Sequence, residues 1–112
     1  MYPVSAEVAD KLVLVAMKSE FPEGPIAKVE APFKGYQATL RFALDSHTVV
    51  AYAIPAKGRS EKGEVIDGFA FQVSHSGTMP ISGGGKARSV FKRIMHDAAL
   101  IASPLPLDPL SQ

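Results

Sequence analysis

The spacing of apolar residues predicts a helix close to the start of the chain. Apolar side chains recur at helical intervals between Val8 and Val15, and Ser5 belongs to the residue types that cap helix N-termini. We therefore expect a helix over residues 6–20. Two prolines and a glycine within residues 21–25 end this helix and turn the chain.

Alternation of apolar and polar residues predicts four strands in the middle of the chain, because successive side chains of a strand point to opposite faces. The expected strands cover residues 27–33, 36–44, 48–54 and 69–74. Pro32 restricts the first strand to an edge of the sheet, and the third is apolar on both faces, which favours a central place. We expect a hairpin connection at residues 45–47 and a polar loop at 56–64.

The expected strands also divide their side chains between two faces. The apolar face of the second strand carries Tyr36, Ala38, Leu40, Phe42 and Leu44, and that of the fourth carries Phe69, Phe71 and Val73. A loop at residues 75–85 follows, and then a helix that ends near Ser103, because Pro104 cannot continue it. The apolar stripe of this helix comprises Val90, Phe91, Ile94, Ala98 and Ile101.

The order helix, four strands, helix predicts an α+β fold. No helical crossover separates the later strands, so the sheet is antiparallel, and both helices pack most simply on one face of it. We expect one domain over residues 1–103 and a proline-rich extended tail over residues 104–112.

Composition narrows the function classes. A chain of 112 residues with a hydrophobic share of 46% fits one compact domain. The net charge of +1 gives no field that would attract the whole molecule to nucleic acid or an anionic membrane. Cysteine is absent, which excludes disulfides and zinc–cysteine sites, and no apolar run is long enough to span a bilayer. We expect a cytoplasmic protein with no membrane contact and no cofactor.

The sequence SGGGKARSVFKR at residues 82–93 departs from ordinary patterning. Glycines leave backbone N–H groups unshielded and a helix start carries partial positive charge, so the run either seats an anion or simply links strand to helix. A P-loop is excluded, because Pro80 and Ala87 stand where its first glycine and its hydroxyl residue belong. The candidate anion- or partner-binding residues are Gly83, Gly84, Gly85, Lys86, Ser89, Lys92, Arg93 and His96.

The histidines indicate no catalytic centre. His47, expected in a turn, and His75, expected at a strand end, do not have metal-ligand spacing such as HExxH with each other or with His96. The serines beside His75 do not indicate a triad, because a nucleophile needs a base that approaches from elsewhere in the fold. We therefore expect surface histidines and a non-enzymatic protein.

The order of elements and the cationic start of the last helix resemble double-stranded-RNA-binding domains, in which that helix start contacts phosphates. This chain has one strand more, and its cationic cluster is reduced to Lys86-Ala87-Arg88. Lys34-Gly35 replaces the Gly-Pro-x-His loop of those domains. The resemblance implies nucleic-acid binding at the basic helix.

A second resemblance rests on three short segments: GFAFQV at residues 68–73, ISGGG at 81–85 and ARSVF at 87–91. A strand, a Ser-Gly-x-Gly turn and an Arg-x-Val-Phe helix in this order are similar to small accessory proteins of tailed bacteriophages. This likeness implies a phage-encoded accessory protein and assigns it no known activity; we expect its partner to be a host or virion protein. Our leading expectation is a small module acting by protein–protein contact; nucleic-acid binding through the basic helix is the alternative, and an enzyme of unrecognised type comes third.

Overall fold

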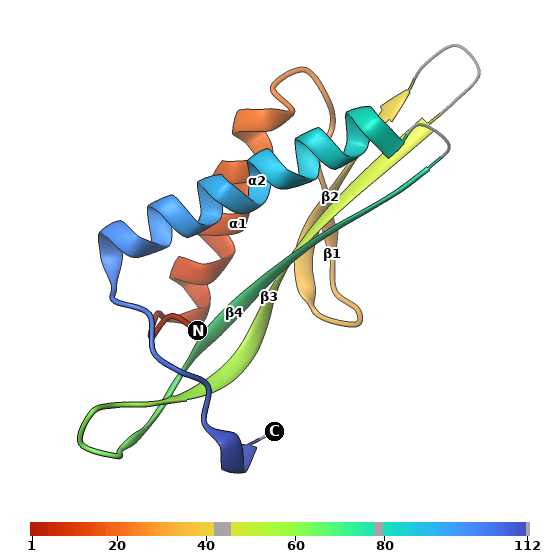
Figure 1. Ribbon diagram of the computed structural model, residues 1–112. Helices are drawn as coiled ribbons and strands as arrows, with labels where there is room; N and C mark the ends of the chain where they lie inside the picture. The colour runs from red at the N-terminus through yellow and green to blue at the C-terminus, as the bar shows by residue number, and fades with distance from the viewer. Residues whose placement is uncertain (42–45, 78–79, 112) are drawn as a thin grey trace.

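The computed structural model describes residues 1–41, 46–77 and 80–111, apart from the side chains of residues 80–84 and 111. The elements are α1 (Ala6–Glu20), β1 (Ala27–Val29), β2 (Lys34–Arg41), β3 (Ser46–Arg59), β4 (Val65–Gly77), α2 (Pro80–Ile101) and a 3₁₀ turn (Pro109–Ser111). The strands form one sheet in the order β1-β2-β3-β4, with every neighbouring pair antiparallel (Figure 1). The predicted α+β class and the order of elements are confirmed.

Helix α1 begins and ends at the predicted residues. The Ser5 hydroxyl accepts a hydrogen bond from the Val8 N–H at 3.2 Å, which satisfies one of the free donors of the first turn. At the other end the Phe21 N–H donates to the Met17 carbonyl at 2.9 Å. The buried face of α1 comprises Ala9, Leu12, Val13, Ala16 and Met17, whereas Val15, expected on this face, is exposed.

One buried cluster joins the helices to the sheet. It includes Val13 and Met17 of α1, Val90 and Ile94 of α2, and Tyr36, Ala38, Val49 and Ala51 of β2 and β3. The two helices contact each other and both contact the sheet (Figure 1). Leu40, Phe69, Phe71 and Val73 pack against the cluster, so the predicted faces of β2 and β4 are confirmed for the described residues. Phe42 and Leu44 lie outside the described residues.

The β3–β4 hairpin is much longer than predicted. The expected loop at residues 56–64 is wrong: β3 continues to Arg59 and pairs with β4 from Val65 onward. The turn occupies residues 60–64, where Gly63 has a positive φ of 83° that suits glycine. Strands of this length, at about 3.3 Å per residue, account for the elongated molecule of 55 × 25 × 23 Å.

The chain on the β1 side of the sheet also differs from the expectation. Strand β1 lies at the edge, as predicted, but it ends at Val29 instead of extending to residue 33. Strand β2 already begins at Lys34 and pairs back with β1, Val29 opposite Gly35, so residues 30–33 form the connection between the two strands. The hairpin connection expected at residues 45–47 is wrong for Ser46 and His47, which are the first residues of β3; residue 45 lies outside the described residues.

Helix α2 begins before the glycine run, and the loop expected at residues 75–85 is wrong. Strand β4 continues to Gly77 and α2 starts at Pro80, so Gly83, Gly84 and Gly85 belong to its first turns. Proline favours the first position of a helix, because its fixed φ is helical and that position needs no N–H partner. Each glycine costs about 1 kcal/mol relative to alanine in a helix interior, and packing further along α2 outweighs this cost.

The buried face of α2 differs from the predicted stripe: Ala87 joins it, and Phe91 and Ile101 do not belong to it. It comprises Ala87, Val90, Ile94 and Ala98. Phe91 and Ile101, expected on it, are 40% and 57% exposed. Phe91 lies at the margin of the face, and Ile101 is the last residue of the helix. Among the residues that the structure describes, no helix is long and apolar enough to cross a membrane.

The C-terminal segment lies along β3 where β2 no longer covers it. The Arg59 N–H donates to the Pro106 carbonyl at 3.0 Å, and the Asp108 N–H donates to the Lys57 carbonyl at 2.9 Å. No β2 residue pairs with β3 beyond Ala53, so this side of β3 is open. The bonds to the C-terminal segment form on this open side, which also tolerates Pro55, a residue without an N–H. The segment therefore completes the sheet locally.

Candidate functional site

Part of the predicted basic surface on α2 is used inside the molecule. The Lys86 ammonium donates to the Glu20 carbonyl at 2.9 Å, lies 3.7 Å from the Glu20 carboxylate, and stands 5.6 Å from the centre of the Phe21 ring. The Arg93 guanidinium donates to the Asp97 carboxylate at 2.8 Å. Both cations are thus neutralised by carboxylates of the same chain, and Lys86 holds α2 against α1.

The other predicted residues of this surface do not form a concentrated cationic patch. Lys92 and His96 are exposed, and Ser89 is half-buried. The glycine run does not form the loop expected to seat an anion, because helical geometry directs the N–H groups of Gly84 and Gly85 to carbonyls four residues earlier. Arg88 and Lys92 remain as exposed cations in the middle of the helix.

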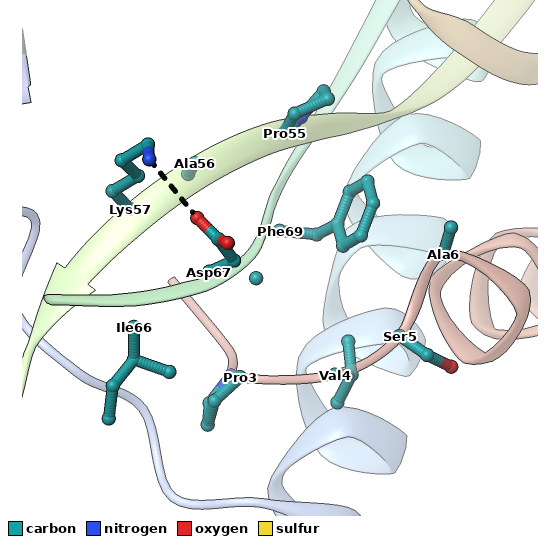
Figure 2. A pocket seen from close by; sticks show the side chains of 11 residues that line it. Pro3, Val4, Ser5, Ala6, Pro55, Ala56, Lys57, Ile66, Asp67 and Phe69 are labelled. Carbon is teal, nitrogen blue, oxygen red and sulfur yellow. Dashed lines mark ion pairs between the residues drawn. The ribbon is translucent and has the colours of Figure 1, made fainter.

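A hollow of about 650 Å³ lies between the chain that enters α1 and the β3–β4 hairpin (Figure 2). Its walls are largely apolar and include Pro3, Val4 and Phe69. At its rim the Lys57 ammonium lies 3.4 Å from the Asp67 carboxylate, and both side chains are exposed. The two side chains neutralise each other while in contact with water, so this ion pair does not indicate a catalytic centre.

A second hollow of about 370 Å³ adjoins the first and shares Phe69 with it. The Tyr36 hydroxyl lies here and donates to the Asp10 carboxylate, 2.8 and 2.9 Å from its two oxygens. Burial, followed by this hydrogen bond and by the negative charge of Asp10, raises the pKa of Tyr36 to about 12. The phenol therefore stays protonated at neutral pH, and the pair joins α1 to β2.

His47 and His75 form a contact that the sequence did not indicate. The Nε2 of His47 lies 3.0 Å from the Nδ1 of His75, and the ring centres are 5.2 Å apart. The distance between the two ring centres exceeds the distance between the two nitrogens by about the width of one ring. Both nitrogens therefore lie on the line that joins the ring centres. A metal ion on that line would need about 2 Å to each nitrogen, so only a proton fits.

The burial of His47 shows that two predictions were wrong for this residue: its place in a turn and its place on the surface. It is 1% exposed within β3, and its Nδ1 has no hydrogen-bond partner. Over residues 1–41, 46–77 and 80–111 no three His, Cys, Asp or Glu side chains gather as a metal site would require. The pair ties β3 to β4 at the end where their pairing stops.

The outer edge of β4 carries unpaired backbone groups. Tyr2 exchanges two backbone hydrogen bonds with Phe69, at 2.8 and 2.9 Å, so the N–H and C=O of Phe69 point away from β3. This direction repeats at every second residue of an antiparallel strand. The backbone groups of Phe71, Val73 and His75 therefore also point outward, and no described residue bonds to them.

Side chains along this edge offer no protection against pairing. Residues 68–77 contain neither a charged side chain nor a proline, the two devices that most often protect exposed strands. Gln72, Ser74 and Ser76 on the outer face are exposed and neutral. The absence of charge was visible in the sequence, but the strand order that makes β4 an edge was not.

Exposed apolar groups accompany the open edge. Phe71 and Val73 are only half-buried, although their side chains face the core. The Tyr2 ring lies 6.2 Å from the Phe71 ring, and the Tyr2 hydroxyl lies 3.7 Å from the Met95 sulfur. Phe91 is one helical turn before Met95, so it occupies the same side of α2 and extends this apolar surface.

The opposite edge of the sheet is protected by several means. Strand β1 has only three residues, and its central residue is Lys28. The Lys28 ammonium lies 3.9 Å from the Glu30 carboxylate, which adds a second charge. Pro25 and Pro32 flank the strand and cannot donate to a further one. The two edges therefore differ sharply in their capacity to pair.

The resemblances to double-stranded-RNA-binding domains and to tailed-phage accessory proteins stay predictions. No family model, curated protein or solved structure matches the chain.

Proposed function

We propose that the protein binds other polypeptides by accepting a strand at the outer edge of β4. The observation that carries this proposal is the row of three outward positions, Phe71, Val73 and His75, between the Tyr2 contact and the end of β4. A strand laid along them would satisfy three N–H and three C=O groups. Strand addition of this kind is a recurrent mode of peptide recognition, in which backbone bonds supply affinity.

The neighbouring side chains would add an apolar contribution. A partner strand beside β4 would cover the half-exposed sides of Phe71 and Val73 and approach Phe91, which is 40% exposed. Burying apolar surface contributes about 25 cal/mol per Å², whereas a backbone hydrogen bond contributes a net 0.5–1.5 kcal/mol, roughly. Pairing and burial together favour a protein over a small ligand at this edge.

Nucleic-acid binding through α2, the alternative function, has less support. Its affinity would depend on cations free to contact phosphates, and each such contact releases counterions. Lys86 and Arg93 are already paired with carboxylates, which leaves Arg88 and Lys92, in the middle of α2, as the exposed cations. Binding of a nucleic-acid duplex with a steep salt dependence, together with loss of that dependence in Lys92→Glu, would favour this alternative.

Amide hydrogen exchange in dilute solution tests strand addition. The probe is a ten-residue peptide of alternating valine and threonine, which forms extended strands. We expect it to slow exchange at Phe71, Val73 and His75 by about tenfold or more, and to leave the exchange of Lys28 in β1 unchanged. Protection elsewhere, or none at the three edge amides, would contradict the proposal.

Two variants separate the edge from the rest of the sheet. Val73→Pro removes an outward N–H without removing a bond to β3, so the sheet persists while the edge loses its central donor. Ser74→Lys places a charge on the outer face of the same strand, and Ser74→Ala is its neutral control. Both Val73→Pro and Ser74→Lys should abolish the slowing by the peptide, and Ser74→Ala should preserve it. Ser74→Lys should leave the melting temperature unchanged, whereas Val73→Pro should lower it, because the Val73 side chain packs against the core.

A further inference from the structure

We infer that the smaller hollow, of about 370 Å³, binds a small organic amine in its protonated form. The ligand class is an ammonium group carried by a compact apolar or aromatic body. The Asp10 carboxylate accepts from the ammonium, and the aromatic wall contacts the body. This site is separate from the open edge of the sheet, because the β4 residue that lines it is Phe69, whose outward backbone groups Tyr2 already holds.

The hollow lies where the first turns of α1 meet the connection between β1 and β2. Ala6 and Asp10 are one helical turn apart, so α1 presents both to the hollow. The connection contributes Phe33, which is 38% exposed, so solvent reaches the hollow on this side. On the other side the Phe69 ring stands between Pro55 and Ala6, and all three residues also line the larger hollow (Figure 2).

Asp10 supplies a carboxylate that no cation of the described residues neutralises. The ion pairs within that part of the chain all use other carboxylates, and Asp10 is half-buried. Its partner is the Tyr36 hydroxyl, which has a single proton to donate to the two carboxylate oxygens. A carboxylate offers about four acceptor positions, and an ammonium carries N–H donors without an acceptor. The remaining positions of Asp10 therefore suit an ammonium.

The charges around the hollow favour a cation over an anion. Its lining carries two carboxylates, Asp10 and Glu30, against one ammonium, Lys34. The Lys28 ammonium lies 3.9 Å from the Glu30 carboxylate, but both side chains are well exposed and water weakens that pair. Burial, the hydrogen bond to Asp10 and the charges of Asp10 and Glu30 together raise the pKa of Tyr36 to about 12. The two charges that help to retain the phenol proton also attract an ammonium placed beside it.

The size and the walls of the hollow select an amine with a compact apolar body. Small-molecule sites commonly enclose about 300–1,000 Å³ and are lined mostly by apolar and aromatic groups with a few polar ones. Aromatic faces contact apolar groups and also attract cations. The apolar and aromatic walls here are formed by Val13, Pro32, Phe33, Ala53, Pro55 and Phe69. A lysine side chain of a partner polypeptide has an unbranched stem, which would leave most of these walls uncovered.

Titration with 2-phenylethylamine, followed by the NMR signals of the backbone amides, tests the site. We expect saturable shifts at Asp10, Phe33 and Tyr36, and binding at least about tenfold weaker for 2-phenylethanol, a neutral analogue of the same size. Asp10→Asn removes the charge and keeps an acceptor for Tyr36, so it should weaken amine binding by about tenfold or more. Glu7→Gln is the matched control: it removes a carboxylate of the same helix that is 80% exposed, and should leave the affinity unchanged.

Several outcomes would overturn the inference. They are no saturable binding of the amine up to about 10 mM, equal affinities for amine and alcohol, and equal affinities of the parent and Asp10→Asn. The comparison of amine with alcohol uses the unmodified protein, so it decides the question even if Asp10→Asn does not fold. Nα-acetyl-lysine methylamide should bind more weakly than the probe; tighter binding would replace the small amine by a lysine of a polypeptide. The valine–threonine peptide tests the β4 edge alone, so the two proposals can fail separately.

Discussion

Replacing Asp108 with alanine should weaken the attachment of the C-terminal segment to the hairpin and lower the stability of the whole fold. Asp108 is 3% exposed, and its Oδ1 accepts from the Arg59 guanidinium at 2.8 and 3.2 Å. The same oxygen lies 3.4 Å from the Leu110 N–H, which donates to it. Alanine removes this acceptor and leaves Arg59 with the Gly63 carbonyl, 3.0 Å away.

The expected loss follows from the burial of the two partners. A hydrogen bond to a charged group contributes about 1.5–3 kcal/mol, and the Arg59 side chain is 36% exposed, so water compensates part of the loss. We expect Asp108→Ala to lower the free energy of unfolding by about 2 kcal/mol. In a domain of this size 1 kcal/mol shifts the melting temperature by about 4–8 °C, which gives a fall of roughly 8–16 °C.

Urea unfolding measures this change without the ionic screening that guanidinium would add. Asp67→Ala is the matched control, because it removes the carboxylate of another ion pair on the hairpin, that of Lys57 with Asp67. The Asp67 side chain is 86% exposed. The control should stay within about 0.5 kcal/mol of the parent. An unchanged midpoint for Asp108→Ala, or equal losses in the two variants, would refute the reasoning.

Three further changes test the core, the Tyr36 hydroxyl and the end of β4. Ile94→Ala, at a fully buried position, should lower stability by about 3–4 kcal/mol in urea unfolding, whereas Leu100→Ala on the exposed side of α2 should cost under 0.5 kcal/mol, roughly. The folded-state pKa of Tyr36 is raised to about 12, above the value of about 10 in the unfolded chain, so its contribution is complete below pH 10 and is lost as pH rises toward 12. Urea midpoints measured from about pH 9 to 11.5 should fall by the equivalent of about 1–2 kcal/mol after solvent screening, and Tyr36→Phe should remove that part of the fall; equal slopes would count against it. Gly77→Ala should cost about 2 kcal/mol or more, because its φ of 144° is strained for alanine and the added Cβ would press on the Ser46 carbonyl oxygen; a near-parental melting temperature would contradict this.

The parts of the fold that were predictable are those where local and tertiary signals agree. The cap at Ser5, the apolar spacing of α1 and the prolines after it all indicate the same helix, and the structure has it at the predicted residues. Local preference misleads where tertiary packing outweighs it. The glycine run disfavours helix locally, yet α2 passes through it because Val90 and Ile94 beyond it pack into the core.

The full length of β3 could not be predicted from the sequence for a similar reason. Lys57 and Gly58 have weak strand propensity, and the alternation fades there. Pairing with β4 on one side and bonds from the C-terminal segment on the other keep this stretch extended. The long-range partners of a strand leave no signature in its own sequence.

Predicting the candidate site would have required the same information about long-range partners. Alternation indicates which side chains of β4 face the helices, and that prediction is confirmed for Phe69, Phe71 and Val73. It does not say which neighbour, if any, lies beside the strand. Likewise, the polar face of α2 was predictable, but the pairing of Lys86 with Glu20 required the packing of α2 on α1.

The contrast between the two edges of the sheet limits how large an assembly can become. A sheet with two open edges could add copies without end and form a filament. Here the two edges differ: β4 is open, whereas β1 has three residues with a central lysine and flanking prolines, which resist further addition. Strand addition at β4, as proposed, would therefore extend the sheet on one side only, and growth through β1 would be blocked.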